Sequence, residues 1–254
     1  MAAILVLHLP DTVESNRLQT VTDALVTRNA TPTGAWHLQQ YLFRRIRNPA
    51  DDQNARVQHI VSMSHFPDQA FICISRPHLA QNGEDSEVGT FTPLDPAYVN
   101  SAAVFLPTPQ MDSYIGMIRR QFGLLWDAGP RLALANGSTW ELDDFTIRVG
   151  DLRQTARGSN QEHGRGLLVE ICLYSETIED REPDRSIPAN SIIEILRHQP
   201  AREMTHHQFA ALRTVDEFWD SLGIAGARKA GGIALDARGY DEIRLLCDIL
   251  RLRS

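Results

Sequence analysis

The most regular pattern in the chain is a pair of alternating segments between positions 140 and 174. In Phe145–Gly150, apolar side chains alternate with polar ones or glycine, which is the period of a half-buried β-strand. A second alternating segment, Leu167–Tyr174, follows a loop rich in glycine and polar residues. Its two faces are Leu167, Val169, Ile171 and Leu173 on one side, and Leu168, Glu170, Cys172 and Tyr174 on the other. The pattern predicts an antiparallel hairpin with a long tip.

Shorter apolar or alternating segments predict further strands on both sides of this hairpin. They are Ala3–Leu9, Thr33–Ile46, Val57–Met63, Ala70–Ser75, Tyr98–Leu106 and Arg131–Asn136. Because the short strands follow one another with few helical crossovers, antiparallel pairing is favoured. The sequence therefore predicts an α+β fold built on an antiparallel sheet of about eight strands.

Four segments have apolar residues at helical spacing. They are Val13–Arg28, Met111–Trp126, Thr205–Leu222 and Tyr240–Arg253. The glycines of Gly223–Gly232 predict a break between the last two helices. We expect the Met111 helix and the two C-terminal helices to pack on the sheet or inside its curve.

The last helix has more apolar surface than docking onto one core requires. One stripe comprises Ile243, Leu246, Cys247 and Leu250, and a second stripe beside it comprises Leu245, Ile249 and Leu252. Together they cover roughly twice the ~100° that a surface helix buries. Either the helix is deeply buried within this chain, or part of the arc contacts another chain. We take Leu245, Ile249 and Leu252 as the candidate partner-binding residues.

The hairpin and four other segments together resemble a known family. The hairpin residues are Asp144–Gly150 and Gly164–Tyr174. The further matches are Met1–Leu9, His59–Phe71, the helix before Trp126 and the helix end Phe218–Gly223. In this order they are similar to subunit 20 of the Mediator complex, a small head-module subunit of the transcriptional coactivator. The resemblance extends thinly over most of the chain.

The resemblance implies a fold and a set of partners. It implies a closed β-barrel in a nuclear, non-catalytic subunit that forms a heterodimer with Mediator subunit 18. Through that partner it would join subunit 8 and the other head-module subunits, and so act indirectly on RNA polymerase II transcription. No catalytic residue, cofactor or metal ligand is carried over from the family, and the partner-binding residues above come from the helix pattern alone.

Composition limits the other functional classes. The chain has 254 residues, enough for a large core, and we expect one domain over 1–254 with mobile loops near 77–96 and 176–190. A formal net charge of −7 disfavours an autonomous nucleic-acid binder, although a local basic patch remains compatible with it. We expect no membrane span and no secretory leader in Ala2–Leu9. The three cysteines lie in apolar segments, which favours buried thiols.

Two other functions are alternatives to the Mediator assignment. Tunnel-barrel enzymes that act on phosphorylated substrates need glutamates at i and i+2 on a strand, so that both bind a divalent cation. Here Glu170 lies between Leu168 and Cys172, and this single carboxylate predicts no metal site. The second alternative is a nucleic-acid-binding module that uses Arg44, Arg45 and Arg47.

Overall fold

A computed structural model of the chain describes residues 1–11, 16–46, 56–75, 102–159, 161–174, 205–234 and 239–250. The expected loops near 77–96 and 176–190 lie outside these residues. The strands are β1 (Ala2–Leu9), β2 (Thr31–Ala35), β3 (Leu38–Arg45), β4 (Val57–Met63), β5 (Gln69–Ser75), β6 (Ala102–Pro107), β7 (Trp126–Leu142), β8 (Phe145–Thr155), β9 (Glu162–Tyr174) and β10 (Arg228–Ala234). The helices are α1 (Arg17–Thr27), α2 (Met111–Gln121), α4 (His206–Ser221) and α5 (Tyr240–Ile249).

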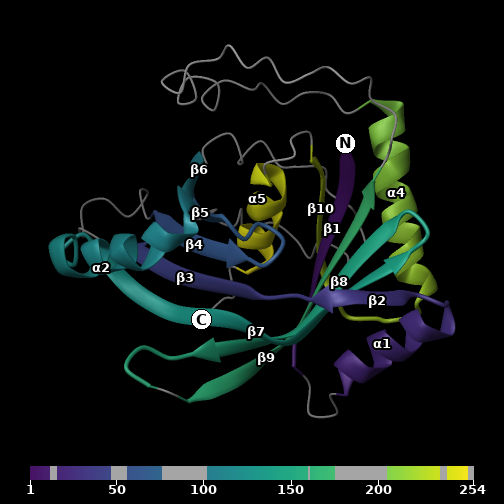
Figure 1. Ribbon diagram of the computed structural model, residues 1–254, viewed down its shortest axis with the longest axis horizontal. Helices are drawn as coiled ribbons and strands as arrows, with labels where there is room; N and C mark the ends of the chain where they lie inside the picture. The colour runs from purple at the N-terminus through teal and green to yellow at the C-terminus, as the bar shows by residue number, and fades with distance from the viewer. Residues whose placement is uncertain are drawn as a thin grey trace, which may run out of the picture.

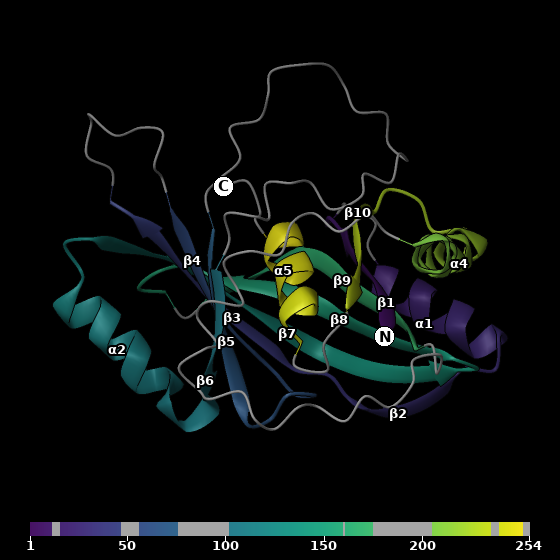
Figure 2. The same ribbon diagram turned by 90° about the horizontal axis from the view of Figure 1, so that it is seen from above.

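All ten of these strands belong to one antiparallel sheet. Its order is β10-β1-β9-β8-β7-β3-β4-β5-β6, and β2 pairs with β7 beside this path. The sheet curls around helix α5, which lies on its concave side between the two ends of the path (Figures 1 and 2). The predicted α+β fold with an antiparallel barrel is confirmed. Within the described residues it is a half-barrel of ten strands, whose ends β10 and β6 are bridged by α5.

The alternation seen in the sequence divides the central strands between two cores. Leu167, Val169 and Ile171 of β9 lie on the convex face, in a core that also holds residues of α1 and α4. Leu168 and Cys172 lie on the concave face, in the core around α5. A third core joins helix α2 to the convex face of β3, β4 and β5 at the other end of the sheet. Figure 2 shows α2 on one flank and α1 with α4 on the other.

Several expected boundaries were correct and others were wrong. The hairpin and strands β1, β4 and β5 lie where the sequence predicted them. The segment Gly223–Gly232 was expected to be a break only, but its second half begins β10, which pairs with β1 from Ala2 to His8. Helix α2 ends at Gln121 instead of Trp126, because β7 begins at Trp126 and pairs there with Arg45.

Two glycines of the hairpin allow the backbones to approach closely. Gly150 of β8 faces Gly137 in the bulge of β7, where a Cβ on Gly150 would lie 3.1 Å from the Cα of Gly137. Gly166 of β9 has a φ of 114°, and a Cβ there would overlap the carbonyl oxygen of Leu9. These contacts explain why glycine is needed at both positions.

We predict that Gly166→Ala destabilises the protein by about 3 kcal/mol or more. The strain of a positive φ, about 1–3 kcal/mol, adds to the collision with the Leu9 carbonyl. The matched control is Gly158→Ala, since Gly158 also has a positive φ of 73° but has nothing within 4 Å of the new Cβ. We expect about 1 kcal/mol for the control. Urea unfolding measures both, and equal losses would show that the close approach to Leu9 has no energetic effect.

Candidate functional site

The concave face of the sheet carries a group of buried polar side chains in an otherwise apolar core. Arg148 of β8 and Glu170 of β9 are opposite one another in the antiparallel ladder, so their side chains project from the same face. The Arg148 guanidinium donates to Glu170 Oε1. Cys172 lies two residues further along β9, and its thiol donates to the same oxygen over 3.4 Å. Glu170 is fully buried, and Arg148 is 6% exposed.

Two further groups reach this cluster from outside the hairpin. Helix α5 contributes Glu242 from its first turn, and the turn between β4 and β5 contributes His65. His65 Nε2 and Glu242 Oε1 share a hydrogen bond of 2.5 Å. The polar cluster Arg148, Glu170, Cys172, His65 and Glu242 thus links the inner helix to three separate strands or turns of the sheet.

Burial sets the protonation of the cluster. It raises the pKa of Glu242 to about 7, against the opposing effects of the Arg148 charge and a hydrogen bond with Glu170. Burial also raises the pKa of Glu170, and the charge of Glu242 raises it further while Arg148 opposes the shift. Burial lowers the pKa of His65 to about 4, so its imidazole is neutral at pH 7. A hydrogen bond between the two glutamates requires a proton on one of them.

The cluster contains donors that a divalent cation would accept. One donor atom from each of His65, Glu170 and Glu242 lies within 4.8 Å of the other two. Imidazole and carboxylates are suitable zinc ligands. However, Arg148 already balances Glu170, and the raised pKa of Glu242, about 7, leaves part of its carboxyl protonated near neutral pH. Burial also raises the pKa of Cys172, as does the charge of Glu170, which keeps the thiol protonated and a poor nucleophile. The arrangement is a neutralised network that fastens α5 to the sheet.

The expected partner-binding residues Leu245 and Ile249 follow Glu242 at helical spacings of three and seven, so they lie on the same buried side of α5. Leu245 and Ile249 are 2% and 3% exposed, within the chain's own inner core. Leu252 lies outside the described residues. In this conformation the chain itself covers Leu245 and Ile249. This agrees with the first alternative, in which the last helix is deeply buried within the chain. Their contact with a partner stays a prediction.

The remaining residues singled out in the sequence are dispersed. Arg44 and Arg45 are exposed at the end of β3, and Arg47 lies outside the described residues. The three cysteines are buried free thiols, as expected. No helix within the described ranges is long and apolar enough to span a membrane.

Sequence reasoning treated Glu170 as a single carboxylate and missed Glu242 and His65. The i, i+2 rule for strands cannot find partners that come from a helix or a turn. One available signal was Glu242 itself, an acid between the apolar stripes of the last helix. The structure places it 5% exposed, facing the sheet.

Comparison with known proteins identifies one matching family model. The model Med20, described as the TATA-binding related factor of subunit 20 of the Mediator complex, matches residues 1–244. No curated protein matches the sequence.

Several solved structures are similar at low identity. The PH1819 protein of Pyrococcus horikoshii has a TM-score of 0.41 at 9% identity, covering 97% of this chain and 99% of that one. A chain of the Schizosaccharomyces pombe Mediator head module gives 0.39 at 11%, covering 87% and 96%. HpAC1 from Hippeastrum, titled a putative adenylyl cyclase with a dominant triphosphatase activity, gives 0.34 at 12%, covering 84% and 96%. At these scores the likenesses carry no argument about function.

We predict that Glu242→Gln changes how stability depends on pH. Because its folded pKa is raised, Glu242 contributes stability that is complete below its unfolded value of 4.5 and is lost as pH rises through about 7. His65 has a lowered folded pKa, so its contribution is present above 6.5 and is lost as pH falls through about 4. Glutamine keeps a donor for His65 but has no titration.

The variant should therefore gain stability relative to wild type as pH rises from 4.5 to 8. A shift from 4.5 to about 7 corresponds to a relative gain of about 3 kcal/mol. Chemical unfolding at several pH values measures the difference between the two proteins, in which the His65 contribution largely cancels. Parallel curves would mean that Glu242 is ionised in the folded protein throughout this range.

Proposed function

The chain belongs to the Med20 family, the TATA-binding related factor of subunit 20 of the Mediator complex, and we propose that it is a non-catalytic head-module subunit that forms a heterodimer with subunit 18. The observation that carries the proposal is the match of the family model over residues 1–244. The proposal places the chain in the nucleus and connects it, through subunit 18, to subunit 8 and the other head-module subunits. It would then act on RNA polymerase II transcription through the assembly, without reading DNA sequence itself.

The interior of the half-barrel supports a non-catalytic role. Tyr240, Ile243, Leu246 and Leu250 of the α5 segment pack in the inner core. They occupy the space that a tunnel-barrel enzyme would use for a phosphorylated substrate. Glu170 is fully buried beneath this helix, so a triphosphate cannot reach it while α5 is in place.

The enzymatic alternative rests on the approach of His65, Glu170 and Glu242 to one another. A barrel hydrolase would release phosphate from triphosphate only when a divalent cation is present, and Glu170→Gln would abolish that release. Under the proposal, purified protein releases no phosphate above background with magnesium or manganese. Metal-dependent release that disappears in Glu170→Gln would support the enzyme instead.

The seam at which α5 meets strand β6 offers an exposed apolar surface for a partner chain. Val104 and Phe105 of β6 are 43% and 44% exposed, although neighbouring residues of this strand pack in the core. Phe105 lies beside Tyr240, the first residue of α5, with ring centroids 6.3 Å apart. Within the described residues β6 ends the strand path, and an edge strand is a common site of chain association.

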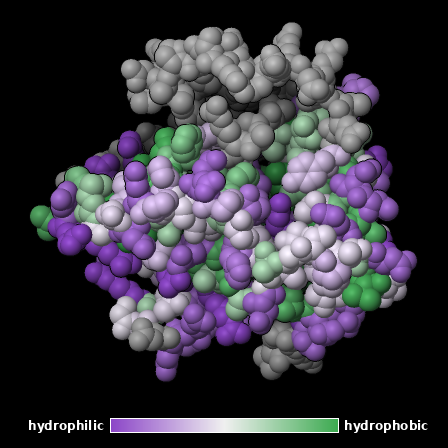
Figure 3. All heavy atoms as spheres, in the orientation of Figure 1, coloured by the Kyte–Doolittle hydropathy of each residue, from purple (hydrophilic) through white to green (hydrophobic). Residues whose placement is uncertain are grey.

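On the face drawn in Figure 3, hydrophobic residues form small separate patches among hydrophilic ones.

We propose that subunit 18 contacts this seam. We propose further that the contact extends to the predicted partner-binding residues, Leu245, Ile249 and Leu252. The seam lies next to the helix on which those residues were predicted. Apolar side chains exposed together at a sheet edge bury readily against a complementary apolar surface.

We predict that Phe105→Glu weakens capture of subunit 18 by about tenfold or more, because it places a charge in an apolar contact. The matched control is Phe209→Glu on helix α4, since Phe209 is 52% exposed but lies on the convex side of the sheet. Pull-down of purified subunit 18 with tagged variants measures both effects. Equal binding by Phe105→Glu and wild type would remove the β6 seam from the interface.

Ile249→Glu tests the helix itself. Because Ile249 is 3% exposed, the substitution also threatens the fold, so lost binding counts only when circular dichroism and the melting temperature match wild type. Unchanged binding by a folded Ile249→Glu variant would exclude the predicted stripe as a partner contact. A wild-type protein that captures no subunit 18 would refute the heterodimer.

A further inference from the structure

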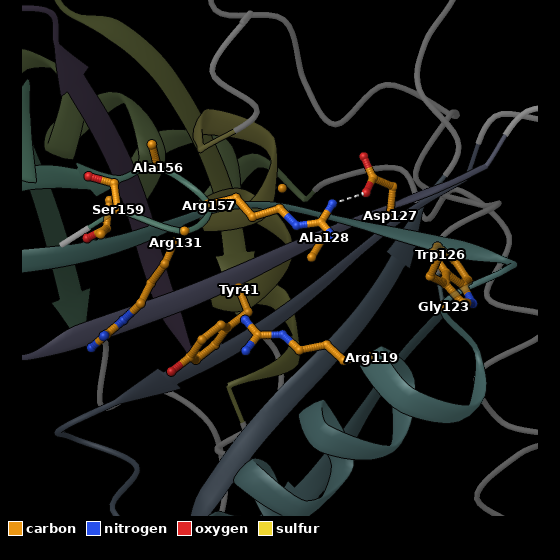
Figure 4. A pocket seen from close by; sticks show the side chains of 13 residues that line it. Tyr41, Arg119, Gly123, Trp126, Asp127, Ala128, Arg131, Ala156, Arg157 and Ser159 are labelled. Atoms are coloured by element: carbon orange, nitrogen blue, oxygen red, sulfur yellow. Dashed lines mark hydrogen bonds and ion pairs between the residues drawn. The ribbon is translucent and has the colours of Figure 1, made fainter. Parts of the chain in front are cut away.

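A cleft with a volume of about 570 Å³ lies on the outside of the half-barrel, away from the polar cluster. Helix α2, strands β3 and β7, and the turn after β8 supply its lining (Figure 4). The lining side chains include Tyr41, Arg119, Trp126, Asp127, Arg131 and Arg157. These residues lie far apart in the sequence, and the curl of the sheet brings them to one place.

Arginines dominate the charge of this cleft. The guanidinium carbons of Arg119 and Arg131 lie 5.9 and 5.6 Å from the centroid of the Tyr41 ring, within the range of a cation–π contact. Figure 4 shows the side chain of Arg119 directed toward Tyr41. Arg157 donates to Asp127 Oδ1 over 2.5 Å, and Asp127 is the carboxylate among the lining residues. The lining therefore holds three guanidinium groups and one carboxylate, and that carboxylate pairs with Arg157.

The basic character extends along the neighbouring strand. Arg44 is opposite Asp127 in the β3–β7 ladder, and Arg45 is opposite Trp126. Both arginines are exposed. The whole chain has a net charge of −7, so this positive region is local and opposes the overall charge. A local field of this kind attracts a negatively charged group over a short range.

One rim of the cleft is apolar. Between α2 and β7 the chain passes through Phe122, Leu124 and Leu125, which are 40%, 91% and 52% exposed. Gly123, which lies between Phe122 and Leu124, and Trp126, which follows Leu125, both line the cleft. Exposed apolar side chains next to guanidinium groups suit a ligand that carries acidic and hydrophobic groups side by side.

We propose that this cleft binds an acidic segment of a partner protein, with carboxylates on Arg119 and Arg131 and an adjacent hydrophobic side chain on the Phe122–Leu125 rim. Charge complementarity selects the acidic groups, and the rim selects a peptide over a nucleic acid. A nucleic-acid backbone would place phosphates, not apolar groups, against the leucines, and the net negative charge of the chain opposes a long polyanion. This surface is separate from the β6 seam, so binding here is independent of subunit 18.

The test uses the full-length protein and a short fluorescent peptide in which aspartates alternate with leucine and phenylalanine. The matched peptide has asparagine in place of every aspartate. Fluorescence anisotropy should show at least about tenfold weaker binding for the asparagine peptide, because charge-assisted hydrogen bonds to the arginines are lost. Binding of the aspartate peptide should also weaken as the salt concentration rises.

The deciding variants differ by one position on α2. Arg119→Glu should weaken binding of the aspartate peptide by about tenfold or more, because it reverses a charge within the cleft. Arg120→Glu makes the same charge change on the same helix, but Arg120 does not line the cleft and its Nε donates to the Gly116 carbonyl. We expect the affinity of this control to stay within about twofold of wild type. Arg131→Gln provides an independent loss from strand β7.

Three results would overturn the proposal. They are equal affinity for the two peptides, equal losses in Arg119→Glu and Arg120→Glu, and tighter binding of single-stranded DNA that the same Arg119 variant weakens. A circular dichroism spectrum and a melting temperature equal to those of wild type show that Arg119→Glu is folded. Loss of peptide binding by this folded variant is the supporting result, whether or not the wild-type protein captures subunit 18.

Discussion

The structure depends on the burial of the central strands on both faces. In β1 and β9 successive residues are buried in turn against the convex and the concave cores. One antiparallel sheet with a single covered face would leave half of these side chains in water. Helices α1 and α4 cover the convex face, and α5 covers the concave one. Since each side chain buried in this way contributes about 1.5–3 kcal/mol, the curled sheet without α5 would expose a large apolar surface. The C-terminal helix is therefore part of the fold.

The position of α5 against the concave face buries the charged groups of the polar cluster, which is energetically unfavourable. Glu242 of the helix and Glu170 and Arg148 of the sheet are buried where the two meet, and burying such ions costs several kcal/mol each unless they are paired and hydrogen-bonded. The pairing of Arg148 with Glu170, together with a proton on Glu242 near neutral pH, reduces the net buried charge. An apolar replacement of the whole group could be as stable, whereas removal of one member leaves an uncompensated charge. We infer that the cluster fixes the orientation of α5, because an unmatched rotation of the helix would separate Glu242 from His65.

The local patterns in the sequence were sufficient for the scaffold but not for the sites. The alternation in Phe145–Gly150 and Leu167–Tyr174 predicted both faces of the hairpin, because each face meets a continuous apolar core. Strand β10 was missed because its glycines and small residues carry no periodic signal, and only pairing with β1 makes it a strand. The approach of Glu242 and His65 to Glu170 could not be predicted, since it depends on which strands α5 crosses. The arginine cleft likewise requires the register of β3 against β7.

The position of α5 also determines where this molecule can interact with others. A half-barrel with an empty interior would offer its concave face to a ligand, but here the chain's own helix fills that face. The surfaces that remain are the ends and the outside of the sheet. At one end, β6 exposes Val104 and Phe105 next to α5, so a partner on this edge would contact the inner helix and the sheet together. A change in the position of α5 relative to the sheet would then alter the surface formed by β6 and Tyr240. Helix α5 therefore carries Glu242 of the polar cluster and Tyr240, which contacts Phe105 of this edge, within its first turn.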